Sequence, residues 1–418
     1  MIKLFRYPEV RKKIIFTLAI IVIFRLLAHV PVPGVDVATI RSFLSGNALF
    51  GMFDLFSGGG FQNFSIVTLG LGPYINASII MQLLTVMVPS LEEMAKEGEY
   101  GRERINLYTK YLSVPMTIVQ AYGIYFLLNK QGAIPVLSSI DLVVLMVTMS
   151  AGATFLVWLG DLVTERGVGN GVSLLIFVGI ISRFPQQIYS YIATLTADTV
   201  FNALLFGILA IVIVASVVLV NEGTRNLVIE YGRTGGRSQK VTNYLPLKIN
   251  QAGVIPIIFA VSVVMVPSLL AGPLSGSANP VIHDIGRYLA NNFSQTDAAY
   301  NILYFLLVVA FTFFYTGIQF NPQKIADDVK KRGGFIPGIR PGMGTARYLK
   351  SVVNRITLAG AVFLGLIAIL PFFFQQSGSV TAMTVGGTSL LIVVSVVLET
   401  IRQTESLMVT RSYDKFLF

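Results

Sequence analysis

The chain has 418 residues, of which 54% are hydrophobic and 12% are charged, and its formal net charge is +10. An ordinary soluble domain has about 25% charged residues, so this composition excludes a water-soluble fold. The apolar residues come in runs close to the roughly 20 residues that a helix needs to cross a bilayer. The sequence therefore predicts an all-α polytopic membrane protein.

Ten apolar runs are candidates for membrane-spanning helices. The first follows a basic N-terminus and could instead be a signal peptide, but Arg25 lies inside the run and no small-residue cleavage site follows it. The fifth run is the shortest and begins after three closely spaced glycines. The expected spans are 14–30, 66–88, 112–128, 142–159, 172–182, 201–220, 254–271, 302–318, 356–374 and 385–398.

An even number of spans places both ends of the chain on the same side of the membrane. Lysines and arginines in short loops are retained in the cytoplasm. If both ends are cytoplasmic, that side holds nearly all of the 31 lysines and arginines. The exceptions are Arg25, Arg41, Lys130, Arg183 and Arg287. The charge distribution therefore predicts that both termini lie in the cytoplasm.

The stretch that starts at Gly51 is apolar, yet Gly58, Gly59 and Gly60 interrupt it before the second span begins. Irregular backbone does not face lipid, because each unpaired N–H or C=O group in hydrocarbon costs several kcal/mol. Two interpretations remain open from these residues alone. The stretch is either a re-entrant segment inside a pore or an external loop whose phenylalanines rest on the membrane interface.

Two cytoplasmic loops are larger than a helical bundle needs. In the first, the arms LVIEY and KVTNYL flank a Gly-Gly pair at 235–236, which predicts a β-ribbon. In the second, Asn321 and Pro322 are typical of a helix start, and Gly333 marks its end. The turned loop FIPGIRPGMG follows, with Arg340 at its centre. Basic, presented loops indicate an acidic or large partner, although they could serve only to set the topology.

Two short repeats relate the second span to the seventh and the fifth to the tenth. The segments 171–176 and 387–392 are identical except that Val172 is replaced by Thr388, and Pro, Ile and Ala recur at matching steps in 73–77 and 256–260. Each half would have an odd number of spans, so the halves must be inverted, as in many transport folds.

The repeats single out apolar residues at helical spacing. Such residues usually face a core or lipid, but if the four related helices surround an axis they would form an apolar constriction that gates by dewetting. The residues are Ile75, Ile79, Val172, Ile176, Ile258 and Ile392.

Groups that would carry chemistry are scarce. No paired carboxylates lie at mid-span, the two histidines His29 and His283 are far apart in the chain, and GRTGGRSQK lacks the spacing of a phosphate-binding loop. The chain contains no cysteine. We therefore expect no catalytic residue, metal site or cofactor. A secondary transporter of small solutes would normally need ionisable residues within its spans.

Several long segments resemble the SecY family, whose members are the central subunit of the bacterial protein-translocation channel. The resemblance covers almost the whole chain and rests on GPYINASIIMQLLT, EGEYGRERINLYTKY, WLGDLVTERGVGNGVSLLIF, LPLKINQAGVIPIIFA, FFYTGIQFNPQKIADDVKKRGGFIPGIRPG and GGTSLLIVVSVVLE. It implies two inverted five-helix halves, 1–200 and 201–418, around a central pore. It also implies a lateral gate between the second and seventh helices.

The resemblance assigns roles to individual residues. The six apolar residues of the repeat match the family's pore ring, with Val172 where many relatives have isoleucine. Gln82, Thr85 and Asn250 resemble polar contacts of the gate, and Arg237, Lys240, Lys248 and Arg340 the surface that binds partners. The re-entrant plug would comprise Phe53, Asp54, Leu55, Phe56, Ser57, Gly58, Gly59, Gly60, Phe61, Gln62, Asn63 and Phe64.

The implied function is a passive channel in the bacterial cytoplasmic membrane. It would pass unfolded polypeptides and release transmembrane segments into the lipid bilayer when a signal sequence and a partner open it. The implied partners are the membrane subunits SecE and SecG, the motor ATPase SecA and the ribosome, with no nucleic-acid function beyond ribosome docking. The alternatives are a secondary transporter and a membrane scaffold that only docks a cytosolic ATPase.

Overall fold

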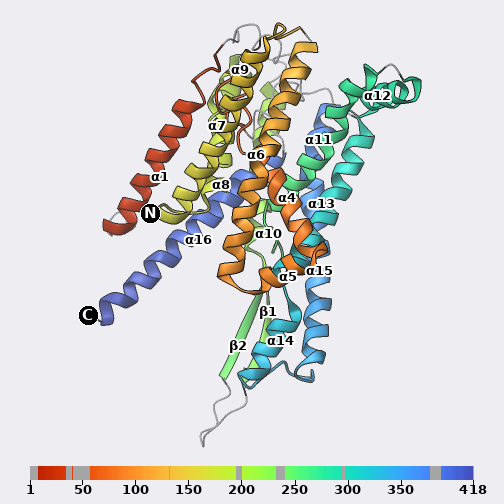
Figure 1. Ribbon diagram of the computed structural model, residues 1–418. Helices are drawn as coiled ribbons and strands as arrows, with labels where there is room; N and C mark the ends of the chain where they lie inside the picture. The colour runs from red at the N-terminus through yellow and green to blue at the C-terminus, as the bar shows by residue number, and fades with distance from the viewer. Residues whose placement is uncertain are drawn as a thin grey trace, which may run out of the picture. The chain divides into compact units, whose positions relative to one another are not determined.

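A computed structural model describes residues 8–33, 40, 57–130, 132–193, 200–231, 241–277, 279–293, 297–376 and 387–417 (Figure 1). The chain forms two compact units. The first consists of Met1–Thr194, Leu269–Ala290 and Val396–Phe418, and the second of Leu195–Ser268 and Asn291–Ser395. The predicted inverted halves, 1–200 and 201–418, stay a prediction.

The first unit is built from helices of the N-terminal part of the chain. α1 packs on α7 and α8, α4 packs on α6, and α6 packs on α7. α4 and α5 meet at a bend of 99°. The helices are α1 (Pro8–Leu27), α4 (Gly72–Met87), α5 (Pro89–Lys96), α6 (Glu99–Lys130), α7 (Ser139–Arg166), α8 (Gly171–Ile181) and α9 (Phe184–Ala193).

Close backbone contacts position α7 and α8. A Cβ atom on Gly171 would lie 1.9 Å from the Gly160 carbonyl oxygen, so only glycine lets the start of α8 approach α7 this closely. The Gly171 N–H donates to Thr164 Oγ1 at 2.9 Å. Asn170 caps α8 by accepting from the Ser173 N–H at 3.2 Å. These contacts set the register of the helix that carries Val172 and Ile176.

The second unit combines helices with a small sheet. The strands β1 (Thr224–Tyr231) and β2 (Val241–Lys248) are antiparallel, with Thr224 opposite Lys248, which confirms the predicted β-ribbon. A third strand, β3 (Gly334–Phe335), extends the sheet in the order β2-β1-β3 and was not expected. The helices within this unit are α10 (Val200–Glu222), α13 (Ala298–Gln319), α14 (Pro322–Lys331) and α15 (Met343–Gln376).

Three further helices each contribute residues to both units: α11 (Ile255–Ser275), α12 (Pro280–Asn292) and α16 (Gly387–Leu417). The short helix α14 begins as predicted, because Asn321 Oδ1 accepts from the Lys324 N–H at 3.0 Å and Pro322 follows it. The helix ends before Gly333, whose φ is +70°. The sheet packs against α15 through a cluster of buried residues: Leu227, Ile229, Leu247, Ile336, Leu349, Val352 and Val353.

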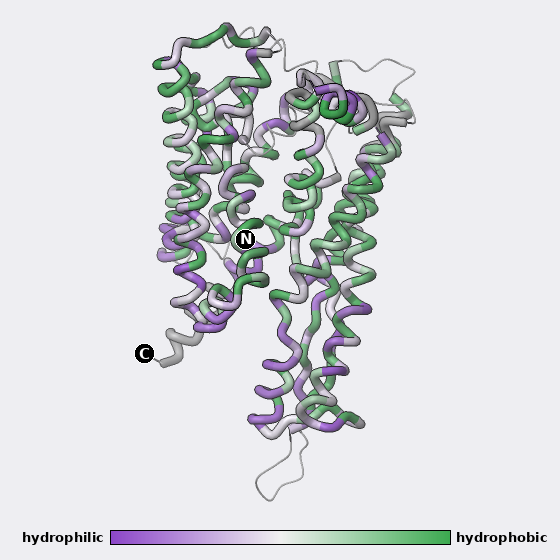
Figure 2. Tube along the Cα trace, turned by 45° about the vertical axis from the view of Figure 1, so that its right-hand side comes forward, coloured by the Kyte–Doolittle hydropathy of each residue, from purple (hydrophilic) through white to green (hydrophobic). Residues whose placement is uncertain are grey.

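Apolar side chains on the helices are widely exposed. Val119 and Val147 in the first unit, and Leu204 and Ile302 in the second, each expose 61% or more of their surface. Such surfaces are unfavourable in water and natural in lipid. Figure 2 shows that hydrophobic residues cover the long helical stretches, whereas hydrophilic residues gather around the strands and α14 in the second unit.

Each predicted span overlaps a helix, but the length and composition of the described helices support fewer crossings. Among the described residues, four helical stretches are long and apolar enough to span a membrane, or up to five if the bent pair of α4 and α5 is one span. The four are Glu99–Asn129, Ser139–Arg166, Ala298–Lys331 and Met343–Phe373. α8 has only 11 residues, against the roughly 20 that a crossing requires. The chain is a multi-pass membrane protein, and the count of ten stays a prediction.

One predicted boundary is wrong. The second span was expected to begin at residue 66, but the helix begins at Gly72 and the residues before it form turns. Gly70 has a φ of +55°, and Pro73 lies in the first turn of the helix. Hydropathy cannot detect this boundary because the turns are as apolar as the helix.

Candidate functional site

The described part of the predicted plug runs from Ser57 to Phe64, while Phe53, Asp54, Leu55 and Phe56 lie outside the described residues. The Phe61 N–H closes a turn by donating to Ser57 Oγ at 2.9 Å. Gly58 and Gly59 have φ values of +65° and +89°, a region that favours glycine. Of the three glycines that the sequence pointed to, Gly58 and Gly59 are therefore favoured by the backbone conformation.

The C-terminal end of the predicted plug belongs to the core of the first unit. Phe61 and Phe64 are both 0% exposed. They lie in one cluster of buried side chains with residues of α6 and α7. The cluster consists of Val32, Ile40, Phe61, Phe64, Leu69, Ala121, Ile124, Tyr125, Leu128, Ala133, Ile134, Leu145, Met149 and Ala153. These two phenylalanines are enclosed by protein rather than resting on a membrane interface.

Backbone hydrogen bonds fasten the residues after the glycines to the segment that follows α1. The Val32 N–H donates to the Phe64 carbonyl at 2.9 Å, and the Ile66 N–H donates to the Val30 carbonyl at 2.9 Å. Pro31 and Ser65 form a β-bridge between these two bonds. The segment from Phe61 to Ile66 is therefore fixed by both its side chains and its backbone.

Arg25 contacts the plug from α1. Its Nη1 donates to the Gly58 carbonyl at 2.6 Å and to Ser182 Oγ at 2.9 Å. The next residue after that serine, Arg183, is a second cation, and burial, followed by the nearby charge of Arg25, lowers the pKa of Arg183 to about 10. The end of α1 and the residue after the α8 cap thus place two positive charges close to each other.

The six predicted pore residues are distributed over both units. In the first unit, Ile75 and Ile79 lie four residues apart on α4 and are each 6% exposed. Ile176 on α8 is buried, and Val172 one turn before it is half-buried. In the second unit, Ile258 on α11 and Ile392 on α16 are also buried. The helical spacing is as predicted, and the meeting of these six side chains in one ring stays a prediction.

The predicted gate residues on α4 bond within their own helix. Gln82 Nε2 donates to Ser78 Oγ at 3.3 Å, and Thr85 Oγ1 donates to the Met81 carbonyl at 2.7 Å. The Gln82 Oε1 atom is buried, and no hydrogen bond reaches it within the part of the chain that the structure describes. Buried acceptors without a hydrogen bond are uncommon in folded proteins.

Asn250 takes part in a polar cluster that sequence reasoning missed. Its Nδ2 donates to Asn221 Oδ1 at 2.8 Å and to the Gly253 carbonyl at 3.2 Å, and Asn221 Nδ2 donates to Ser395 Oγ at 2.7 Å. Asn250 is 6% exposed. The cluster joins the end of α10, the residues between β2 and α11, and α16. No spacing rule links these three residues, which lie far apart in the sequence.

The predicted partner-binding residues lie on the second unit. Lys248 is exposed at the end of β2, and Arg340 is exposed in the loop between β3 and α15. The Arg340 carbonyl accepts from Thr345 Oγ1 at 3.2 Å, and Gly338 has a φ of +78°. Arg237 and Lys240 lie outside the described residues.

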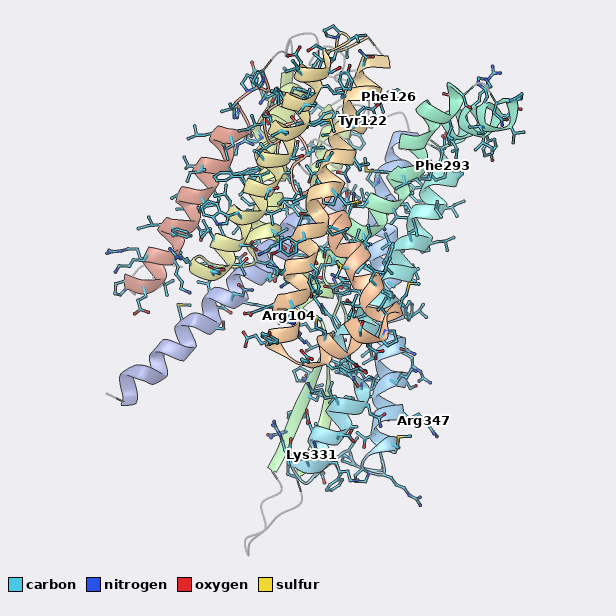
Figure 3. The ribbon with its side chains drawn as sticks, viewed as in Figure 1. Arg104, Tyr122, Phe126, Phe293, Lys331 and Arg347 are labelled. Carbon is cyan, nitrogen blue, oxygen red and sulfur yellow. The ribbon has the colours of Figure 1, made fainter. Side chains whose placement is uncertain are left out.

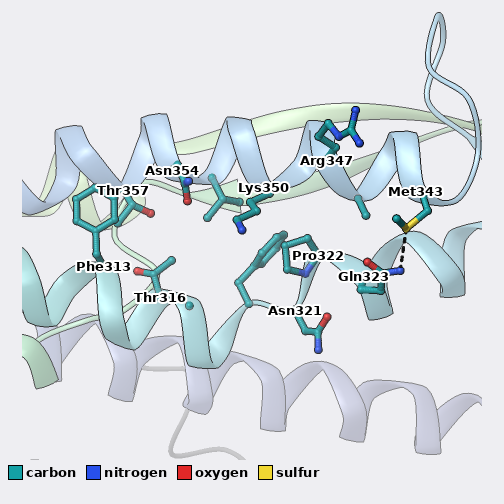
Figure 4. A pocket seen from close by; sticks show the side chains of 14 residues that line it. Phe313, Thr316, Asn321, Pro322, Gln323, Met343, Arg347, Lys350, Asn354 and Thr357 are labelled. Atoms are coloured by element: carbon teal, nitrogen blue, oxygen red, sulfur yellow. Dashed lines mark hydrogen bonds between the residues drawn. The ribbon is translucent and has the colours of Figure 1, made fainter. Parts of the chain in front are cut away.

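A cavity of about 580 Å³ lies beside this loop, between α13, α14 and α15 (Figure 4). Lys350 points into it, and one end is closed by the Gln323 amide, which contacts Met343 Sδ at 3.4 Å. Arg347 belongs to its lining, and Figure 3 shows this residue and Lys331 in the same part of the second unit as the strands. The loop that contains Arg340 therefore lies next to a basic part of the second unit. Among the described residues no group of three His, Asp or Glu side chains could hold a metal ion.

Comparisons with known proteins identify close relatives of the chain. A family model described as SecY matches residues 65–401. The protein translocase subunit SecY of Corynebacterium glutamicum is 42% identical over 443 residues, which cover 100% of this chain and 99% of the relative.

Solved structures share the fold. One is a SecY protein whose plug domain stabilises the closed state of the translocation channel and maintains a membrane seal. It has a TM-score of 0.62 and 21% identity, over 95% of this chain and 92% of that one. Another is an idle yeast Ssh1 complex bound to the 80S ribosome, with a TM-score of 0.61 and 16% identity, over 96% of this chain and 89% of that one.

Proposed function

The chain belongs to the SecY family of protein translocase subunits, and we propose that it is the channel subunit through which unfolded secretory polypeptides cross the bacterial cytoplasmic membrane. The observation that carries this proposal is the match over the whole chain to a translocase subunit. The exposed apolar helices and the basic second unit agree with a membrane-embedded channel that docks partners. Both termini are proposed to lie in the cytoplasm.

The proposed pore ring consists of Ile75, Ile79, Val172, Ile176, Ile258 and Ile392. A channel for unfolded chains must admit side chains of every kind and still hold back ions. An apolar ring suits both demands, because it dewets when empty and offers no group that coordinates an ion. The half-buried Val172 is smaller than isoleucine and would loosen the seal slightly.

The proposed plug closes the external side, and its moving part ends at the glycines. Residues 53–60 would swing outward, while Phe61 and Phe64 remain in the core of the first unit. The supporting observations are the left-handed conformation of Gly58 and Gly59 and the backbone bonds that fasten the segment after them. The three glycines would act as the hinge, since they resist rotation least.

The lateral gate would lie between α4 and α11. A hydrophobic signal sequence gains about 0.8 kcal/mol for each CH₂ group that it moves from water to lipid. Its insertion beside Gln82 and Thr85 would separate the two helices, and transmembrane segments would leave by the same route. The buried oxygen of Gln82 has no hydrogen bond from the residues that the structure describes, which supports a role in which this side chain exchanges hydrogen bonds as the gate moves.

Cytosolic partners would bind the ribbon and the loop that carries Arg340. We propose SecA and the ribosome as these partners, and SecE and SecG as the membrane subunits. The exposed positions of Lys248 and Arg340 support docking of a large anionic surface. The relation to an Ssh1 complex that is bound to a ribosome agrees with this.

Single-channel conductance in planar bilayers tests the proposal. The purified complex should conduct no ions, and deletion of residues 53–60 should produce brief channel openings. Replacing Ile75 and Ile258 by Asn should allow ions to leak, because the polar groups hydrate the constriction. Replacing Ile15, an exposed apolar residue of α1, by Asn is the control and should leave conductance unchanged. If neither the deletion nor the ring variant conducted ions, a scaffold without a pore would explain the chain better than a channel.

A further inference from the structure

Arg25 is a charged residue in the last turn of α1, and it follows an uncharged, largely apolar run from Ile14 to Phe24. Intramembrane charges are rare unless they have a function. Its Nη1 donates to the Gly58 carbonyl at 2.6 Å and to Ser182 Oγ at 2.9 Å. A single nitrogen atom therefore joins α1, the proposed plug and the residue that ends α8. These three segments lie within the first unit and are far apart in the sequence.

Ser182 is oriented to accept from the arginine. Its hydroxyl donates to the Gly179 carbonyl at 2.8 Å, and its N–H donates to the Val178 carbonyl at 3.0 Å. The hydroxyl proton is thus already used, and an oxygen lone pair remains for Arg25. The acceptor is held on the end of a helix rather than on a loose side chain.

Gly58 fits into a narrow space between α1 and α8. A Cβ atom at this position would lie 2.5 Å from Phe24 Cζ and 3.1 Å from the Gly179 Cα. The plug backbone reaches Arg25 only because residue 58 has no side chain. The bond to the Gly58 carbonyl therefore exists only while the plug is seated in this space.

The strength of this contact follows from the charge. Arginine stays protonated at any physiological pH, and hydrogen bonds from an ionised donor are about twice as strong as neutral ones. When the plug leaves, Arg25 keeps Ser182 but loses the Gly58 carbonyl.

We propose that Arg25 is a positioning residue that clasps the seated plug to the end of α8 through Gly58 and Ser182, and so sets how readily the channel opens. This inference rests on the proposed function, because it requires that residues 53–60 move. A charge at this position would bias the channel towards its closed state. "Opening" then includes breaking one charge-assisted hydrogen bond.

The test uses the full chain in its complex and a single engineered cysteine. The chain has no cysteine of its own, and Ser57 is 0% exposed, so Ser57→Cys reports when the plug leaves its seat. The rate of labelling by a membrane-impermeant maleimide added from outside is measured in this background. The variants are Arg25→Gln, Arg25→Lys and Ser182→Ala. Arg287→Gln, an exposed arginine on α12, is the control for the loss of one positive charge.

Arg25→Gln should speed labelling about ten-fold or more, the change expected on losing a hydrogen bond to a charged group. Ser182→Ala should speed it less, and Arg25→Lys should restore part of the slow rate, since an ammonium keeps the charge with a shorter reach. Arg287→Gln should label at the parent rate. The open frequency in planar bilayers should follow the same order.

Equal labelling rates for Arg25→Gln and the parent would overturn the clasp. The deletion of residues 53–60 separates this failure from failure of the channel itself. If the deletion opens the channel while Arg25→Gln has no effect, only the clasp is wrong. If the deletion also stays silent, the proposed function fails and the clasp with it.

Discussion

Gly58→Ala should unseat the plug, because position 58 combines an unfavourable conformation with a lack of space. An L-residue in the left-handed region costs about 1–2 kcal/mol. The new Cβ would also lie 2.5 Å from the tip of the Phe24 ring, and overpacking of this kind costs about 1–3 kcal/mol. Together these effects should disfavour the seated plug by about 2–5 kcal/mol, a shift in its equilibrium of ~30-fold or more.

The neighbouring glycine provides a matched control. Gly59 has a φ of +89°, but among the described residues outside its chain neighbours a Cβ there would meet only Arg25 Nη1, at 3.8 Å. Gly59→Ala should therefore show the conformational effect without the clash. In addition, Phe24→Leu removes the ring tip and should rescue part of the Gly58→Ala defect when the two are combined.

The assay is the fraction of time that the channel conducts in planar bilayers, with thermal unfolding in detergent to exclude general destabilisation. Gly58→Ala should conduct more often than Gly59→Ala, and the combination with Phe24→Leu should lie between Gly58→Ala and the parent. A Gly58→Ala channel as tight as the parent would refute the reasoning. So would a larger defect in Gly59→Ala than in Gly58→Ala.

Three further predictions concern the stability of the separate units, measured by thermal or denaturant unfolding in detergent. Asn250→Ala should lower the free energy of unfolding by about 1–3 kcal/mol, because it leaves the buried polar partners of Asn250 without their hydrogen bonds. An unchanged free energy of unfolding would show that water can take the place of the Asn250 side chain. Gly171→Ala should be severely destabilising, because its Cβ would lie 1.9 Å from a backbone oxygen. Gly123→Ala should be neutral or stabilising, because a Cβ there would meet no described atom of another segment within 4 Å. Similar melting temperatures for the two variants would contradict this. Lys110→Met breaks the 2.7 Å ion pair with the half-exposed Asp161 and should change the free energy of unfolding by about 1 kcal/mol or less. A larger loss would mean that this pair is shielded from solvent.

The local features of the chain could be predicted from its sequence because their causes are local. The apolar runs place helices, since a helix satisfies its own backbone in any apolar surrounding. Asn321 and Pro322 mark the start of α14, and the alternating arms of the ribbon pair across a short connection. The segments that resemble the SecY family cover almost the whole chain. This is why the channel function could be inferred from sequence.

Tertiary structure decided what hydropathy leaves open. A phenylalanine next to glycines reads the same whether it faces lipid, water or a core, and only the fold shows Phe61 and Phe64 enclosed by α6 and α7. The strand β3 has two residues and pairs with Glu230 and Tyr231 about a hundred residues earlier, so it has no sequence signal of its own. Arg25 was visible as a charge within a span, but its acceptors, a glycine carbonyl and a serine after α8, are brought to it only by folding. Contacts between distant segments depend on how apolar surfaces pack, and packing is not encoded in any single stretch of the chain.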